Sequence, residues 1–168
     1  MTLRDHCIEI RPAERSDYPS IVAVNAAAVR ETSPMSLESV AVLAGLACYF
    51  KVTVAGKEVA AFLMGLREGM PYDNDNYRWV SGRFRTFLYI DRIVVGSAHT
   101  GRRIGSLLYA DLFSYARLNG ISNVICEYNI EPPNAASAAF HKAMGFKEIG
   151  TQWVANRSKR VSLQLMAI

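Results

Sequence analysis

Glycines and arginines gathered in one short turn indicate a site that binds phosphate groups. The stretch VVGSAHTGRRIGS, residues 94–106, predicts a strand that passes through a turn into an amphipathic helix. The first N–H groups of a helix have no partner within the helix, and the helix dipole makes this end positive, so anions bind there. Gly101 and Gly105 allow a ligand to approach the backbone closely, and Arg102 and Arg103 add positive charge. The sequence therefore predicts a phosphorylated ligand.

Two common nucleotide motifs fit this turn poorly. Gly96 and Gly101 have the four-residue spacing of a P-loop, but Arg102-Arg103 follow where that loop needs Lys and then Ser or Thr. No hydroxyl stands where Mg²⁺ would need one. A Gly-x-Gly-x-x-Gly dinucleotide motif is absent, and the turn lies in mid-chain without a preceding βαβ unit. The sequence disfavours both nucleotide sites, and we expect no metal.

Three ionisable side chains are candidates for acid–base chemistry. Asp91 lies two residues before Ile93 in a predicted strand, and it is either a base or a salt-bridged residue at a strand end. Glu127 lies in a strand that should be largely buried, where an unpaired carboxylate is costly. It is therefore either paired structurally or faces a cleft as a base or amine-binding group. His141 is an acid, a hydrogen-bond donor to a thiol, or a histidine on a helix surface.

These residues depend on a regular order of strands and helices. Alternating or continuous apolar runs predict strands, and apolar residues at helical spacing predict helices. The expected strands are residues 7–11, 49–55, 58–66, 87–95, 123–129, 147–154 and 160–166, and the expected helices are residues 16–28, 36–46, 103–118 and 134–144. Gly56-Lys57 predicts a tight hairpin. Residues 67–85 predict an aromatic-rich loop, which is either a substrate wall or a loop packed on its own side chains.

Length and composition limit the class of protein. The 168 residues suit one mixed α/β domain, and 51% apolar with 20% charged residues is ordinary for a folded, soluble chain. No apolar run approaches the ~18 residues of a membrane span, and Arg4 and Asp5 stand where a signal peptide would be apolar. We therefore expect a cytoplasmic protein. Cys7, Cys48 and Cys126 predict reduced thiols, and a net charge of +4 favours a small anionic ligand over nucleic acid.

The second half of the chain resembles the GNAT superfamily of acyl-CoA-dependent N-acetyltransferases. The resemblance rests on the 101–105 turn with its helix, the strand that ends at Asn129, and the stretch NAASAAFHKAMGF, residues 134–146. Residues 1–90 add only the order of elements. The resemblance implies a single domain whose mixed, mostly antiparallel sheet of six or seven strands is flanked by helices and splayed between residues 87–96 and 123–129. It also implies acetyl-CoA as co-substrate and a primary amine as acceptor, either a small amine or amino acid or a protein amine.

In this family the strand, the turn and the helix after it bind the pantetheine and pyrophosphate of acetyl-CoA, and the later helix flanks the pantetheine arm. The candidate bases are the carboxylates on the strands that flank the splayed edge, Asp91 and Glu127, and His141 is a third catalytic candidate because it occupies the position of a family tyrosine. Asn134 also reads as a helix cap, and both roles can coexist. The implied cofactor-binding residues are Ile93, Val94, Val95, Thr100, Gly101, Arg102, Arg103, Ile104, Gly105, Ser106, Asn129, Asn134, Ser137, Phe140 and His141.

The chain departs from the family pattern at three positions. Thr100 replaces an Arg or Gln, Arg103 replaces a glycine, and His141 replaces a tyrosine that often protonates the departing thiolate. If Arg103 already belongs to the helix, it needs only an ordinary φ and the backbone contacts survive. If the family glycine serves to avoid a clash, the pyrophosphate must bind in a slightly different position. These departures support one alternative, a non-catalytic acyl-CoA-binding sensor or interaction module of the same fold. The edges of the final strands are compatible with a homodimer.

Overall fold

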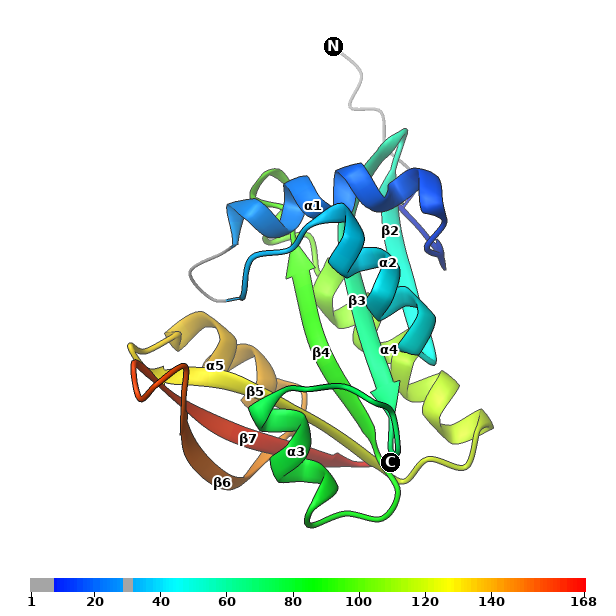
Figure 1. Ribbon diagram of the computed structural model, residues 1–168. Coiled ribbons are helices and arrows are strands. Elements are labelled where there is room, and N and C mark those ends of the chain that lie inside the picture. The colour runs from blue at the N-terminus through cyan, green and yellow to red at the C-terminus, as the bar shows by residue number, and fades with distance from the viewer. Residues whose placement is uncertain (1–7, 29–31) are drawn as a thin grey trace.

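The computed structural model describes residues 8–28 and 32–168, which form a seven-stranded sheet with helices on both faces (Figure 1). The strands are β1 (Ile8–Pro12), β2 (Tyr49–Ala55), β3 (Glu58–Arg67), β4 (Leu88–Val95), β5 (Asn123–Glu131), β6 (Lys147–Val154) and β7 (Lys159–Ala167). The α-helices are α1 (Tyr18–Ala27), α2 (Leu37–Leu46), α3 (Asp75–Ser81), α4 (Ile104–Leu118) and α5 (Ala135–Ala143), with short 3-10 turns at Arg15–Asp17 and Ser97–His99.

The sheet opens between its two central strands. The strand order is β1-β2-β3-β4-β5-β7-β6, and every neighbouring pair is antiparallel except β4 and β5. That parallel pair is in register only at Leu88 with Val124 and at Tyr89 with Ile125. From Ile90 onward β4 pairs with β3 alone. The fold class and the splay predicted from the sequence are therefore confirmed.

Helices on opposite faces of the sheet approach this opening from opposite sides. The packing of Ile21, Val40 and Val94 places α1 and α2 on one face, and α3 covers the same face further along, where Tyr77 and Val80 lie on Tyr89 and Ile125 (Figure 1). On the other face α4 packs through Leu108 and Leu112, and α5 adds Phe140. The opening thus lies between an α1–α3 side and an α4–α5 side.

Helix α3 corrects the expectation of a loop over residues 67–85. Asn74 caps this helix, because its Oδ1 accepts from the N–H groups of Asn76 and Tyr77 at 2.9 and 3.0 Å. Tertiary packing also holds α3 in place. A Cβ on Gly150 of β6 would lie 2.6 Å from Trp79 Cζ2, so this glycine permits the close contact. A helix of one to two turns leaves little periodic signal in the sequence, which is why it was missed.

The other predicted elements are found with small shifts of their ends. Helix α4 begins at Ile104 rather than at residue 103, and β5 continues to Glu131. The hairpin at Gly56 connects β2 and β3 as expected, with a φ of +67°. Cys7 lies outside the described residues, and Cys48 and Cys126 are free thiols. Within the described ranges, no helix combines the length and apolar character needed to cross a bilayer.

Candidate active site

The turn before α4 keeps a glycine-like backbone at a position occupied by arginine. Arg103 is the N-cap of α4 and has a φ of +60°, and Gly101 has a φ of +77°. Arg103 therefore lies just before the helix and does not have the ordinary φ that the first of the two alternatives requires. A non-glycine residue in this left-handed conformation costs roughly 1 kcal/mol. The turn has thus kept the backbone path that a glycine would favour, with a charged side chain added.

Several N–H groups of this turn have no protein partner. No side chain caps α4, and its first intrahelical bond runs from Leu107 N to Arg103 O at 3.1 Å. Among the residues that the structure describes, the N–H groups of residues 104–106 therefore find no acceptor. Arg102 and Arg103 are exposed beside them, and Arg102 Nη1 lies 3.2 Å from His99 Nδ1. Free donors, a helix N-terminus and two cations make this turn suitable for phosphate.

The two cofactor-binding segments predicted from the sequence meet at one glycine. A Cβ on Gly105 in α4 would lie 3.2 Å from Phe140 Cζ in α5, closer than side chains normally pack. Asn134 caps α5, because its Oδ1 accepts from Ser137 N at 3.0 Å. The predicted cap is confirmed. The absence of a side chain at Gly105 therefore allows the turn and helix α5 to lie close together.

A cavity of about 330 Å³ fills the opening between β4 and β5. It brings together side chains that are far apart in the sequence, and it is lined from both faces of the sheet. The predicted residues among its walls are Asp91, Ile93, Glu127, Asn129, Asn134, Ser137 and His141. The turn residues 100–106, Val95 and Phe140 lie outside it, and Val94 packs in the core beneath α1. All three candidate catalytic residues thus share one cavity.

Glu127 sits on the α1–α3 side of the cavity with one oxygen unpartnered. Its Oε1 accepts a hydrogen bond from the Tyr89 hydroxyl at 2.9 Å, whereas its Oε2 is shielded from solvent and has no hydrogen-bond partner among the described residues. Burial, reinforced by the negative charge of Asp91, raises the pKa of Glu127 to about 8, although the Tyr89 hydrogen bond opposes this shift. Glu127 thus has a structural partner and also lines the cavity, and its role as a base or amine-binding group stays a prediction.

His141 sits on the α4–α5 side and is buried, so its interpretation as a surface histidine is wrong. Its Nε2 lies 2.8 Å from the Tyr109 hydroxyl, and its Nδ1 lies 2.8 Å from the Ser137 carbonyl and 3.1 Å from the Ser137 hydroxyl. The carbonyl can only accept, so Nδ1 carries the proton and Nε2 accepts from Tyr109. Burial lowers the pKa of His141 and favours this neutral form. The ring also stacks on Tyr128, with centroids 5.6 Å apart.

Asp91 is salt-bridged, but in the middle of β4 rather than at its end. Its Oδ2 accepts from Arg92 Nε at 2.7 Å, and its Oδ1 accepts from the Tyr72 hydroxyl. The tyrosines that contact the three candidate residues, Tyr72, Tyr89 and Tyr109, were not foreseen. The hydroxyl of each tyrosine forms a hydrogen bond with a residue at least nineteen positions away in the sequence, so no local sequence pattern reveals these tyrosines.

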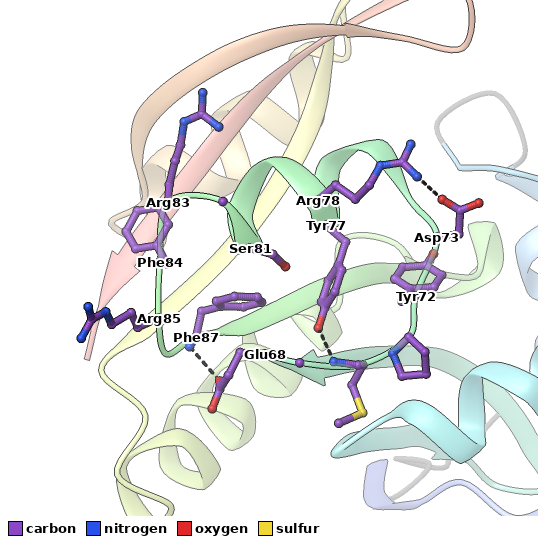
Figure 2. Close-up of a pocket in the computed structure, with 14 residues that line it drawn as sticks. Glu68, Tyr72, Asp73, Tyr77, Arg78, Ser81, Arg83, Phe84, Arg85 and Phe87 are labelled. Carbon is purple, nitrogen blue, oxygen red and sulfur yellow. Dashed lines mark hydrogen bonds and ion pairs between the residues drawn. The ribbon is translucent and has the colours of Figure 1, made fainter.

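A second, larger cavity lies within the connection between β3 and β4 (Figure 2). It measures about 930 Å³ and is lined only by residues 68–87, none of which is a predicted site residue. Its walls are tied together internally, since Met70 N donates to the Tyr77 hydroxyl at 2.9 Å and Phe87 N donates to Glu68 at 3.0 Å. We therefore place the candidate site in the smaller cavity. Among the described residues, no group of His, Cys, Asp or Glu could hold a metal ion.

Comparisons with known proteins agree with this geometry. Residues 42–146 match the model of the acetyltransferase (GNAT) family. A search of curated protein sequences gave no match. Among solved structures, Ard1 from Thermoplasma volcanium has a TM-score of 0.77 at 17% identity, covering 96% of this chain and 97% of that one.

Two further structures are similar over the same extent. The ribosomal-protein-S18-alanine N-acetyltransferase from Escherichia coli has a TM-score of 0.73 at 16% identity, covering 96% of this chain and 94% of that one. The yncA protein from Salmonella typhimurium, solved with its cofactor acetyl-CoA, has a TM-score of 0.72 at 19% identity and the same coverage. At such identities these structures show a shared fold. The family model covers more than half of the chain, and the protein therefore belongs to the GNAT acetyltransferase family.

Proposed function

We propose that the protein transfers an acetyl group from acetyl-CoA to a primary amine by direct attack in a ternary complex. The observation that carries this proposal is Glu127, a carboxylate in the wall of the cavity between the splayed strands, with one shielded oxygen that finds no hydrogen-bond partner in the described part of the chain. Such a group has a raised pKa and is suited to take a proton from an ammonium ion, either directly or through one water. Membership of the GNAT family and the acetyl-CoA-bound yncA structure support acetyl-CoA as the donor.

Acetyl-CoA would enter from the α4–α5 side. The free N–H groups of residues 104–106 and the charges of Arg102 and Arg103 would hold the pyrophosphate. The edge of β4 from Ile93 to Val95 is not paired with β5, so its backbone can bond the amides of pantetheine as an added strand would. Asn129, Asn134 and Ser137, which line the cavity, would then flank the arm near the thioester.

The chemistry needs one proton acceptor and little else. The bound ammonium gives a proton to Glu127, and the resulting neutral nitrogen attacks the thioester carbonyl carbon. The N–C bond forms, the C–S bond breaks, and the second proton on nitrogen moves to the departing sulfur. A primary amine with a pKa of ~10.4 is almost fully protonated at neutral pH, so the first transfer requires a base, whereas a thiol with a pKa of ~8.5 leaves readily.

His141 is better suited to hold helix α5 in place than to protonate the departing sulfur of CoA. Both of its ring nitrogens are engaged, by Tyr109 on α4 and by Ser137 on α5. It therefore ties the two helices together behind the cavity. Because a thiolate is a good leaving group, replacement of the family tyrosine by His141 leaves the proposed reaction feasible.

The proposal is tested by binding and turnover on the wild-type chain. Calorimetry should show acetyl-CoA binding, and a panel of primary amines should release free thiol from acetyl-CoA in proportion to the acetylated amine detected by mass spectrometry. Acetyl-CoA binding without thiol release for any amine would favour the alternative, a sensor or interaction module, for which the altered residues Arg103 and His141 are the motivation. Absence of binding at millimolar acetyl-CoA would reject both.

A further inference from the structure

Two neighbouring residues of β4 form a buried ion pair at the edge of the cavity. The side chains of Asp91 and Arg92 are 2% and 8% exposed, and Arg92 Nε donates to Asp91 Oδ2 at 2.7 Å. Adjacent residues of a regular strand point to opposite faces of the sheet. Here the register with β3 shifts between Met64 and Gly65, which leaves Asp91 as an extra residue in β4. This bulge redirects the two side chains so that they can meet.

The ion pair also holds two separate walls of the cavity. Asp91 Oδ1 accepts from the hydroxyl of Tyr72, which is labelled in Figure 2 and lies just before the cavity-lining residues 74–76. Arg92 Nη1 donates to Ser33 O at 3.1 Å and to Asn25 Oδ1 at 3.0 Å, and its Nη2 lies 3.2 Å from the Ser33 hydroxyl. Both Thr32 and Ser33 line the cavity. The connections β3–α3 and α1–α2 are therefore fastened to the same point of β4.

We propose that Asp91 and Arg92 are a positioning pair. The pair holds the β3–α3 and α1–α2 connections in place around Glu127, on the α1–α3 side of the cavity where the amine would bind, and thereby sets the affinity for the amine. This inference rests on the proposed function, with Glu127 as the base. Both oxygens of Asp91 already accept hydrogen bonds, one of them from a guanidinium, so Asp91 is poorly placed to take a proton from substrate. Glu127 Oε2, by contrast, has no hydrogen-bond partner among the described residues.

The pair also acts on the charge of Glu127. The polar groups whose electrostatics are coupled to this carboxylate are Tyr89, Asp91 and Arg92 on β4, Asn76 on α3 and Tyr72 before α3, together with Cys126 on β5 and Tyr109 on α4, which lie on the opposite face of the sheet. Among them, Asp91 raises the pKa of Glu127, while Tyr89, Asn76 and Arg92 lower it. Removing the Asp91 charge should therefore move the acidic limb of the activity profile to lower pH, a change that a purely structural ion pair would not produce.

The chain contains a matched control for this pair away from the cavity. Asp111 on α4 accepts from the Tyr49 hydroxyl at 2.6 Å and from Lys51 Nζ at 2.7 Å, which repeats the tyrosine–aspartate–cation arrangement. None of these three residues lines the cavity. Tyr49 is 2% exposed and Tyr72 is only half-buried, so removal of the Tyr49 hydroxyl should disturb the fold at least as much.

Steady-state kinetics of Tyr72→Phe and Tyr49→Phe test the proposal. Tyr72→Phe should raise the KM for the amine about fivefold to tenfold, the usual effect of losing one hydrogen bond, with the KM for acetyl-CoA unchanged. Tyr49→Phe should change neither. In Asp91→Asn the acidic limb of kcat/KM should also move to lower pH. Equal effects of the two tyrosine variants, or an Asp91→Asn enzyme that is inactive at every pH with normal amine binding, would overturn the positioning role.

Backbone hydrogen exchange separates failure of this inference from failure of the proposed function. If the wild-type chain acetylates no amine, the proposed function fails, yet the pair can still be tested on the free protein. Tyr72→Phe should then accelerate exchange at residues 32–36 and 72–76 together, although these segments are not adjacent in sequence. Acceleration confined to residues 72–76, or none, would show that the pair does not join the two walls.

Discussion

On the α4–α5 side of the cavity, the proposed cofactor contacts come, apart from Asn129, from two short segments, residues 93–106 and 134–141. On the α1–α3 side, the contacts join residues that are far apart: Tyr89 and Glu127 are 38 residues apart, and Arg92 and Asn25 are 67 apart. Each segment of the first side follows from backbone conformation within a turn or a capped helix, and the contact of Tyr109 on α4 with His141 on α5 joins the two segments. The second exists only after the sheet has formed. The two sides should therefore respond differently to substitution, with cofactor binding tied to one and turnover and amine binding tied to the other.

The largest expected effect separates turnover from cofactor affinity. Glu127→Gln should lower kcat about 10²-fold or more, the usual contribution of a general base, while acetyl-CoA affinity by calorimetry stays within about twofold of wild type. Gln keeps the shape of the side chain and can still meet the Tyr89 hydroxyl. A variant with unchanged kcat would assign Glu127 a structural role.

The pH dependence of catalysis should report on the same carboxyl group. The pKa of Glu127 is raised to about 8, and the base must be ionised to act, so kcat/KM should increase as pH rises through about 8. The acidic limb should be absent or altered in Glu127→Gln, whose residual activity has no such titration. A wild-type profile that is flat between pH 6 and 9 would contradict this assignment.

The same shift has a consequence for stability. In the folded state Glu127 holds its proton up to about pH 8, and in the unfolded chain only up to about 4.5, so the folded state binds more protons between these values. Its contribution to the free energy of unfolding is therefore fully present below pH 4.5 and is lost as pH rises through about 8. Thermal unfolding should show Glu127→Gln gaining stability relative to wild type as pH rises across this window. A difference that does not vary with pH would argue against a perturbed carboxyl group.

On the other side, Gly105→Ala should weaken cofactor binding and leave the amine site unaffected. The added Cβ would lie 3.2 Å from Phe140 Cζ and force α4 and α5 apart, so acetyl-CoA affinity should fall several-fold. Gly45→Ala in α2 is the matched control, because its Cβ would meet nothing within 4 Å. Isothermal titration of both variants measures the difference, and Phe140→Leu should restore affinity to Gly105→Ala. Equal affinities for the two glycine variants would show that this contact is unimportant.

The smallest expected effect concerns the arginine at the turn. Arg103→Gly should relieve the left-handed backbone and raise the free energy of unfolding by up to ~1 kcal/mol, measured by chemical denaturation. The same variant should bind acetyl-CoA a few-fold more weakly at low salt, because it loses one charge near the phosphates. Arg103→Ala is the control, since it loses the charge but keeps the strain. Equal stability of the two variants would show that the conformation at residue 103 is not strained.

Much of the fold could be read from local patterns. Gly56 at a hairpin, Ser36 and Asn134 as helix caps, and the apolar spacing of α4 all act through neighbours within a few residues. Helix α3 escaped notice because its stability comes from Tyr77 and Val80 packing on the sheet rather than from its own sequence. The positive φ of Arg103 likewise comes from the surrounding turn and not from the residue type. Arginine ordinarily avoids a positive φ, but the surrounding turn can impose one.

The amino-acid sequence was sufficient to indicate the order of elements, the turn that we propose to bind phosphate and three candidate catalytic residues, because each depends on spacing along a few turns or one strand. It could not assign roles to those three residues. Glu127 is the best candidate for the base, because it is buried and its Oε2 has no hydrogen-bond partner among the described residues. Both ring nitrogens of His141 already have hydrogen-bond partners, which leaves it a structural role. A bulge in β4 turns Asp91 toward Arg92 and Tyr72. These differences arise from desolvation and from hydrogen bonds between distant segments, and such contacts come into being only when the chain has folded.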